Sequence, residues 1–279
     1  MMEKPLVSVC IPAYNNAEYI GETIDSILKQ TYQNLELVVV DDNSKDDTLK
    51  VLQEYAAKDN RVRVYHNENN LGMSGNWNHC LELCRGEFIK LVCADDLLAE
   101  NALEKEVQAL IEHPSAVMAE SDTKLVDLNG NGKGFYKRFG AKGLVSGSKV
   151  ARKGFFVKNY FGAPQANTFR KSAYEKVGGF DTDYTYILDY DFWVELAKLG
   201  DVYIIHESLN FFRVRNDSNT GQVMGEDKQK TAIYVAEHRH LLEKNKEALH
   251  LSGFEVELSV LIRRLRCFMA SVYLKIFVR

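Results

Sequence analysis

Short apolar runs alternate with helix-like segments over the first 120 residues, and this alternation constrains the fold more than any other feature. The segments between the runs carry apolar residues at helical spacing and are long enough to cross over a sheet. Strand–helix–strand units of this kind predict a mostly parallel sheet with right-handed crossovers and helices on its faces. The runs are rich in β-branched residues and lie at residues 6–11, 35–40, 62–65, 88–93 and 116–119.

Two of the predicted strands end in paired acidic residues. Residues 35–40 lead into Asp41 and Asp42, and the strand at 88–93 is followed by Asp95 and Asp96. Ligands of parallel sheets bind beyond the carboxyl ends of the strands, so both pairs are expected at one ligand-binding edge. Carboxylates there can hold a hard cation such as Mg²⁺ or Mn²⁺, although Asp is also common in turns and at helix N-termini.

The second half of the chain has a less regular pattern. Residues 123–150 are rich in Gly, Lys and Asn, which predicts a mobile excursion and not a packed element. The 279 residues are expected to form one α/β domain at 1–220 and a C-terminal helical extension at 221–279. The domain divides into two halves, at about 1–122 and about 123–220. Within the extension, residues 226–249 predict a long surface helix because they are charged and favour helix.

The last predicted helix is amphipathic. A basic amphipathic helix can lie on an anionic membrane surface, and it can equally pack on its own domain or on a second copy of the chain. Both interpretations stay open. The apolar stripe consists of Leu258, Leu261, Leu265, Phe268, Val272 and Ile276, and the basic residues around it are Arg263, Arg264, Arg266 and Lys275.

The composition excludes some classes of function. A formal net charge of −4 argues against a nucleic-acid-binding protein. The five cysteines are odd in number and form no CxxC pair, which indicates reduced thiols. There is no secretory signal pattern and no run of about 20 apolar residues. The chain is therefore expected to be cytoplasmic, with peripheral contact at the inner face of the cell membrane left open.

Four segments, in order from Val7 to about Trp193, resemble glycosyltransferase family 2. The resemblance implies a GT-A fold, which is Rossmann-like, and an inverting enzyme that moves a sugar from a nucleotide diphosphate to an acceptor hydroxyl. The segments are VSVCIPAYNNAEYIGETIDSILKQTYQNLELVVVDDNSKDDT, NNLGMSGNWNHCLELCRGEFIKLVCADD, FGAPQANTFRKSAYEKVGGFD and LDYDFW.

The resemblance also implies a nucleotide-binding half at about 1–122, an acceptor half at about 123–220, and particular donor-binding residues. Pro12, Tyr14 and Asp42 match the nucleoside pocket of the family, where Asp42 would accept a hydrogen bond from a base imide such as uracil N3–H. Gly72, in the Asn70-Leu71-Gly72 turn, matches the family's turn below the donor. UDP is the expected nucleotide, while dTDP satisfies the same Asp42 interaction and GDP stays open.

The metal-binding acids depart from the family pattern at one position. Asp95 and Asp96 match the acids that contact the metal and the ribose, and they predict a Mg²⁺ or Mn²⁺ cofactor. Many members have Asp-X-Asp-Asp here, but this chain has Cys93 at the first position. A thiol is a poor ligand for a hard cation, so binding falls to Asp95 and Asp96, with the choice between them open.

The acceptor-side motif LDYDFW implies the catalytic base. Asp189 matches the aspartate that takes the proton of the acceptor, although from the residues alone it also fits a helix N-cap. Leu188 stands where many members have Glu, which leaves the base role to Asp189, with Asp191 as second candidate. Trp77 replaces a common Arg, and Trp on a helix more often packs than stacks on a ligand.

A later segment, FFRVRNDSNT, resembles the part of the family that closes over the diphosphate. Arg213 and Arg215 would bind the leaving group there, since guanidinium matches phosphate oxygens bidentately. Alternate positions on one strand share a face, as this interpretation requires. Two solvated arginines on an edge strand remain the alternative.

The expected reaction is a single displacement in polysaccharide or glycolipid biosynthesis, with a glycan or glycolipid acceptor. Two other functions would require different features in the sequence. A sugar nucleotidyltransferase needs a Gly-rich basic loop after the first strand, where this chain has PAYNNAEYI. A non-catalytic sugar-nucleotide-binding or scaffolding subunit is favoured only if Cys93 and Leu188 mark a decayed active site.

Overall fold

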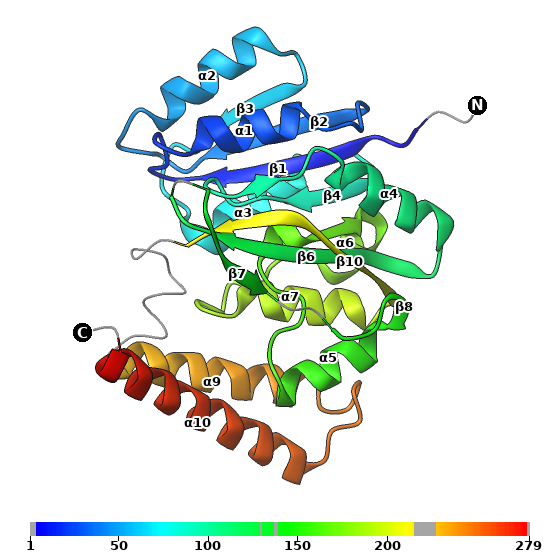
Figure 1. The fold of residues 1–279 in the computed structure, drawn as a ribbon, viewed down its shortest axis with the longest axis vertical. Coiled ribbons are helices and arrows are strands. Elements are labelled where there is room, and N and C mark those ends of the chain that lie inside the picture. The colour runs from blue at the N-terminus through cyan, green and yellow to red at the C-terminus, as the bar shows by residue number, and fades with distance from the viewer. Residues whose placement is uncertain (1–3, 129, 137–138, 215–226, 278–279) are drawn as a thin grey trace.

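The computed structural model describes residues 4–128, 130–136, 139–214 and 227–277, with side chains up to residue 269. Its centre is a ten-stranded mixed sheet flanked by helices (Figure 1). The strand order is β3-β2-β1-β4-β9-β6-β10-β5, with β7 paired to β6 and β8 paired to β10. An α/β sheet covered by helices confirms the predicted fold class.

The N-terminal half supplies the parallel strands. Side chains alternate between the two faces, so that Val9 enters one apolar cluster and Cys10 the other. Burial on both faces explains why these strands read as continuous apolar runs. The strands are β1 (Val7–Ala13), β2 (Leu35–Asp41), β3 (Val62–His66) and β4 (Phe88–Leu91), and within this group each pair of neighbours is parallel.

The remaining strands make the sheet mixed. The strand after β4 in the order, β9, is antiparallel to both β4 and β6, while β10 is parallel to β6. The short β5 is antiparallel to β10. The elements are β5 (Leu97–Leu98), β6 (Ala116–Val126), β7 (Gly132–Tyr136), β8 (Gly143–Ser146), η1 (Pro164–Ala166), β9 (Asn167–Arg170) and β10 (Asp201–Arg213).

Helices cover the sheet in layers (Figure 1). The helices fall into three groups, given at the end of this paragraph. Those of the first group pack in the apolar cluster that contains Val9, and those of the second pack in the cluster that contains Cys10. The third group forms an outer layer beyond α7. The groups are α1 (Ile20–Leu28), α2 (Thr48–Lys58) and α4 (Ala102–Glu112); α3 (Gly72–Glu82), α6 (Lys171–Val177) and α7 (Leu188–Ala197); and α5 (Gly147–Phe156), α9 (Lys228–Lys244) and α10 (Gly253–Phe277).

The segment at 123–150 is not the excursion that its composition predicts. It contains the end of β6, the strands β7 and β8, and the start of α5. The polar residues form a hairpin turn in which Asp127 and Asn131 are hydrogen-bonded, and Gly130 has a φ of 79°. A Gly-rich sequence therefore marks a turn between paired strands here, since Gly adopts positive φ without steric cost.

The charged segment at 226–249 is also less exposed than predicted. Its helix, α9, ends at Lys244, and Val235, Leu241 and Leu242 on it are buried. Charged residues dominate its composition, but an apolar side still packs into the core. The predicted domain boundary at residue 220 lies outside the described residues.

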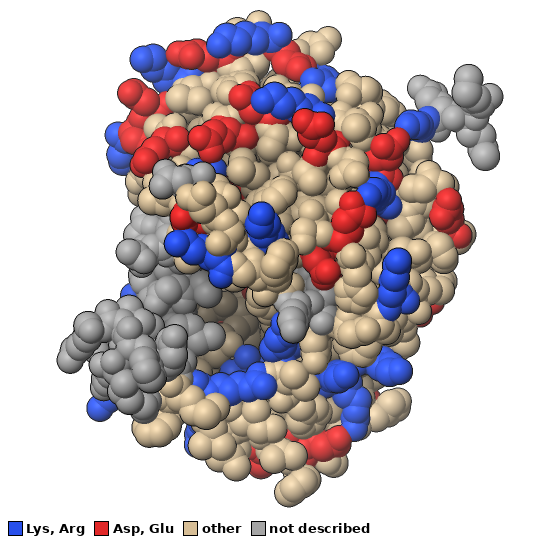
Figure 2. Space-filling view, viewed as in Figure 1, with Lys and Arg blue, Asp and Glu red and all other residues tan. Residues whose placement is uncertain are grey.

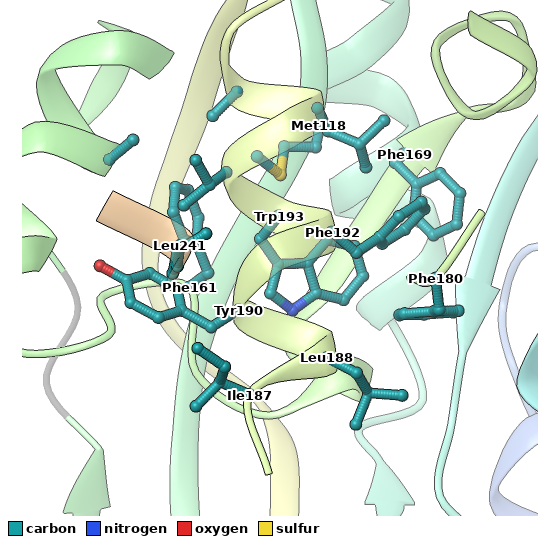
Figure 3. Close-up of a cluster of buried hydrophobic side chains, with 14 of the residues drawn as sticks. Met118, Phe161, Phe169, Phe180, Ile187, Leu188, Tyr190, Phe192, Trp193 and Leu241 are labelled. Atoms are coloured by element: carbon teal, nitrogen blue, oxygen red, sulfur yellow. The ribbon is translucent and has the colours of Figure 1, made fainter. Parts of the chain in front are cut away.

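An aromatic cluster anchors α7 beneath the sheet (Figure 3). The ring of Phe192 lies 5.5 Å from Phe169 of β9 and 4.3 Å from Phe180. Trp193 lies 5.7 Å from Phe169 in an edge-to-face contact. Such pairs add about 0.5–1.5 kcal/mol each beyond burial. The helix that begins at Leu188 is therefore held rigidly against the sheet.

Candidate active site

Two acidic segments leave the same edge of the sheet, one on each side of β1. Asp42 N–H donates to the Ala13 carbonyl at 2.8 Å, and Val92 N–H donates to the Cys10 carbonyl at 2.9 Å. Pairing with β1 therefore continues past the ends of both β2 and β4. Because neighbouring strands are about 4.8 Å apart, the Asp42 and Asp95 segments emerge roughly 10 Å from one another.

Side chains that follow β2 hold the backbone of the loop that follows β1. Asn15 N–H donates to Ser44 Oγ at 2.9 Å, and Asn16 N–H donates to Thr48 Oγ1 at 2.8 Å. These bonds fix the loop that follows β1, where the sequence predicts part of the nucleoside pocket. Tyr14 in this loop is 45% exposed, so its ring is open to solvent at this edge of the sheet. Pro12, on β1, is half-buried.

The carboxylate of Asp42 lies at the N-terminus of α3. Its Oδ1 accepts Leu71 N–H at 2.8 Å and Asn67 Nδ2–H at 2.8 Å, and its Oδ2 accepts Gly72 N–H at 3.0 Å. Backbone N–H groups at a helix start stabilise a negative charge. Gly72 has a φ of 74°, which explains glycine at the turn.

Sequence reasoning missed the polar network behind Asp42. Asn67 also donates to Asn76 Oδ1 at 3.1 Å, and its own Oδ1 is hydrogen-bonded to His79 Nδ1 at 2.7 Å. Asn76 donates in turn to the Val40 carbonyl at 3.2 Å. Asn67 and Asn76 are buried. The available signal was the position of Asn76 within the segment NNLGMSGNWNHC, which resembles the family.

The two acids after β4 have different surroundings. Asp96 is 1% exposed, and its Oδ1 accepts Arg213 N–H at 2.9 Å. Asp95 is half-buried and more open to solvent. Asp96 therefore joins this loop to the end of β10, and Asp95 is the acid better placed to meet a ligand.

Arg213 does not present its guanidinium to solvent. The side chain is buried, its Nη2 donates to Glu22 Oε2 at 2.6 Å, and it lies 5.2 Å from the ring centre of Tyr19. This placement supports a structural role that joins β10 to α1, in contrast to the predicted contact with a diphosphate. Arg215 lies outside the described residues.

Three carboxylates lie close enough to Cys93 to affect the pKa of its thiol. Burial raises the pKa of its thiol well above the ordinary value, and the negative charges of Asp96, Asp95 and Asp189 each raise that pKa further. The thiol therefore stays protonated. Asp189 comes from α7, so acids from distant parts of the chain lie near the same thiol.

Asp189 occupies the first turn of α7. Its Oδ1 accepts Tyr190 N–H at 2.7 Å, and the side chain is half-buried. Burial raises the pKa of the Asp189 carboxyl to about 6, and the backbone N–H groups of Tyr190 and of Asp189 itself offset part of that rise. A carboxylate with a pKa close to neutrality is suited to accept a proton.

Asp191 is engaged by a lysine of α9. It is buried, and Lys244 Nζ of α9 donates to its two oxygens at 2.9 and 3.0 Å. Burial raises the pKa of Asp191 to about 6, although Lys244 acts in the opposite direction. This ion pair joins α7 to α9 and favours Asp189 over Asp191 as the base. Leu188, where many family members have Glu, is buried in the core.

A glutamate of α9 holds the backbone that precedes Asp189. Glu237 Oε1 accepts Thr185 N–H at 2.7 Å, and its Oε2 accepts Tyr186 N–H at 2.9 Å and Ile187 N–H at 3.2 Å. These donors lie at the start of α7, where N–H groups lack helical partners. About 50 residues separate the two segments, so no local pattern in the sequence could reveal the contact.

We expect Glu237→Gln to lower the free energy of unfolding by about 1–3 kcal/mol, because the new amide group faces N–H donors. The same variant should lower kcat for the sugar transfer that the sequence resemblance implies, while donor binding stays unchanged, since Glu237 orients α7 only. Urea unfolding and initial-rate kinetics measure the two effects. Glu243→Gln, an exposed change on the same helix, is the control. Full kcat in Glu237→Gln would contradict a positioning role.

The described residues contain no group of three or more His, Cys, Asp or Glu side chains in position to hold a metal ion. Mg²⁺ is usually bound through one or two carboxylates together with phosphate oxygens of the substrate, so the Asp95 and Asp96 pair fits such an ion. The protonated thiol of Cys93 does not add a ligand.

A parallel β3-β2-β1-β4 sheet with acids beyond β2 and β4 is the arrangement expected of a GT-A type fold. The family model for glycosyl transferase family 2 matches residues 8–178, and the chain belongs to that family. This confirms the resemblance identified in the sequence, and it places the chain among glycosyltransferases and not among nucleotidyltransferases.

Relatives and solved structures agree with this assignment. An uncharacterized protein of Mycobacterium tuberculosis is 34% identical over 79% of this chain and 71% of its own length. The GalNAc(5)-diNAcBac-PP-undecaprenol beta-1,3-glucosyltransferase of Campylobacter jejuni is 32% identical over 83% of this chain and 71% of its own length.

The solved structures support the fold. S. aureus TarS has a TM-score of 0.70 at 21% identity, with 98% of this chain covered and 46% of TarS, so this chain spans under half of TarS. S. aureus TarS 1–349 in complex with UDP-GlcNAc has a TM-score of 0.68 at 20% identity, over 98% of this chain and 76% of that one. Mannosyltransferase PcManGT from Pyrobaculum calidifontis, in complex with GDP-Man and Mn²⁺, has a TM-score of 0.66 at 19% identity, over 98% and 76%.

Proposed function

We propose that this glycosyltransferase inverts the anomeric centre of a sugar carried by a nucleotide diphosphate, with a UDP-sugar as the donor. The observation that carries the proposal is that Asp95, Asp96 and Asp189 all raise the pKa of Cys93, which follows β4 at the edge where Asp42 follows β2. Acids for the donor and a base for the acceptor are thereby within one site.

The nucleoside is proposed to bind beside Asp42 and Tyr14. A carboxylate offers about four acceptor positions, and the hydrogen bonds to Asn67, Leu71 and Gly72 use three. The fourth can accept the imide N–H of uracil. The UDP-GlcNAc complex of the TarS structure supports a uridine donor, while dTDP offers the same imide group. The GDP-Man complex of PcManGT keeps a guanosine donor as an alternative.

A divalent cation is proposed to bind at Asp95. This acid is half-buried, whereas Asp96 is buried and accepts Arg213 N–H. The Mn²⁺ in the PcManGT structure supports this assignment. When bound, the ion would stabilise the negative charge of the departing diphosphate.

Asp189 is proposed to act as general base. It takes the proton of the acceptor hydroxyl while the hydroxyl oxygen forms a bond to the anomeric carbon and the sugar–phosphate bond breaks. The electron pair of that bond leaves with the nucleoside diphosphate. One displacement inverts the configuration. The aromatic cluster, Glu237 and the Asp191–Lys244 pair hold α7 so that Asp189 stays in place.

The acceptor is proposed to be a glycan or a glycolipid. The name of the Campylobacter relative, which describes an undecaprenol-linked glycan acceptor, supports this class. Figure 2 shows a recess in the surface above α9, with Lys and Arg side chains gathered below it. Basic side chains there suit an acceptor that carries phosphate.

A thermal-shift screen tests the proposal. The preferred nucleotide sugar, at about 100 times its Kd, should stabilise the protein by about 2.7 kcal/mol and raise Tm by several degrees, more so with Mn²⁺ than without. No shift with any UDP-, dTDP- or GDP-sugar would contradict it. A shift without release of nucleoside diphosphate, when Mn²⁺ and a range of acceptors are supplied, would favour the non-catalytic subunit.

A further inference from the structure

The outer face of α10 carries an exposed apolar ridge. Residues that are 36–75% exposed recur along it at helical spacing, and the ridge is about 22 Å long at 1.5 Å per residue. This is the densest group of exposed large apolar side chains among the described residues. The ridge consists of Phe254, Leu258, Leu261, Leu265, Phe268 and Met269.

The opposite face of α10 already packs on the protein. Val256 and Val260 are buried in the core, and Ser259 Oγ donates to the Phe155 carbonyl at 2.8 Å. Arg263 Nη1 donates to Tyr234 Oη of α9 at 2.9 Å. The packing of α10 on α9 and α5 therefore leaves the ridge uncovered, at the outer edge of the molecule (Figure 1). Exposed apolar side chains in a row mark an interaction surface.

Basic residues flank the ridge. Arg264 is exposed and Arg266 is half-buried, and helical geometry places them on opposite sides of it. The acids of α10 are matched by arginines of other elements. Glu257 forms a two-point ion pair with Arg239 at 2.5 and 2.7 Å, and Glu255 pairs with Arg152. The charge left beside the ridge is positive.

We propose that α10 docks the enzyme on an anionic phospholipid surface, with the ridge in the acyl boundary and Arg264 and Arg266 at the headgroups. A convex apolar strip with basic flanks is what an interfacial helix presents to a bilayer. Among the described residues no helix is long and apolar enough to cross a membrane, so contact lies in the plane of the surface. The side chains of Val272, Lys275 and Ile276 lie outside the described part.

A second copy of the chain fits this surface less well. A strip about 22 Å long and one helix wide, about 10 Å, covers only a few hundred Å². A stable dimer interface buries about 800 Å² on each partner. A lipid surface needs no such complementary area.

Docking through α10 would bring the acceptor side of the enzyme close to lipid. The helix packs on α9, whose Glu237 and Lys244 hold the start of α7 and therefore Asp189. The inference extends the proposed function without depending on it, since lipid binding is measured in the absence of any sugar nucleotide.

Co-sedimentation with vesicles tests this inference on the full chain. Binding to vesicles of equal parts phosphatidylglycerol and phosphatidylcholine should exceed binding to phosphatidylcholine alone by about thirtyfold, because Arg264 and Arg266 contribute about 1 kcal/mol each near the surface. Leu261→Glu/Leu265→Glu should lower binding by at least about tenfold. Ile111→Glu, on α4, changes an equally exposed apolar residue away from the ridge and should have no effect.

Two outcomes would overturn the inference. One is a protein that does not bind the anionic vesicles at all. The other is a dimer in sedimentation velocity that Leu261→Glu/Leu265→Glu dissociates, since the ridge would then be an interface between copies. Nucleotide-sugar thermal shifts of the same variant should match the wild type, which separates loss of docking from failure of the proposed function.

Discussion

Asp189→Asn is expected to lower kcat for sugar transfer by roughly 10²–10⁴-fold, the contribution of a general base. Asparagine keeps the shape of the side chain but cannot take the acceptor's proton. Donor binding should stay close to wild type, because Asp42 and Asp95 are unchanged. Initial rates with saturating donor, together with thermal shifts by the same donor, measure the two effects.

The same variant should be more stable than the wild type above pH 6. Burial raises the pKa of Asp189 to about 6, above the value of about 3.9 expected for unfolded chains. The ionised carboxylate therefore weakens the folded state above pH 6, and this effect disappears as the pH falls below about 4. Asn carries no charge, so the variant lacks this destabilising effect. Urea unfolding at pH 8 and pH 4 measures the difference.

The pH profile provides a further test of Asp189. Because a base must be ionised, wild-type kcat should be level above pH 6 and fall about tenfold per pH unit below it. Asp183→Asn removes an exposed carboxyl from the preceding loop and should leave both rate and profile unchanged. Transfer by Asp189→Asn at close to the wild-type rate would show that another group is the base.

Asp95→Asn is expected to lower kcat by roughly 10²–10³-fold, since a catalytic metal supplies several kcal/mol of charge stabilisation. The additional rise in Tm that Mn²⁺ gives in the presence of the nucleotide sugar should also disappear. The fold should be retained, because Asp95 is half-buried and the bond to Arg213 N–H belongs to Asp96. Rates and melting temperatures across a Mn²⁺ titration measure these effects.

Comparison with Asp96→Asn decides which acid binds the ion. Asp96→Asn should destabilise the protein, since the side chain is buried and bonded to the Arg213 backbone. Glu100→Gln, an exposed acid beyond the same loop, is the neutral control. If Asp95→Asn keeps full activation by Mn²⁺ while Asp96→Asn loses it, the metal assignment moves to Asp96.

Local patterns predicted the N-terminal half of the fold well. Continuous apolar runs identified the strands around Val9 and Val38, because both faces of these strands are covered. Composition misled where tertiary contacts override it. The Gly-rich turn at Gly130 joins paired strands, and α9 buries Leu241 despite its many charges. Propensity is only a weak prior when a segment can pair with or pack on a distant element.

The sequence by itself determined the family, the sheet edge, and Asp42, Asp95 and Asp189 as candidates, because strand periodicity and the motifs that resemble the family are local. Only the tertiary structure decided how these residues are held. It pairs Asp191 with Lys244 and Arg213 with Glu22. It also placed Glu237 at the start of α7 and left one face of α10 uncovered. These contacts join residues that are far apart in the chain, and packing alone brings them together.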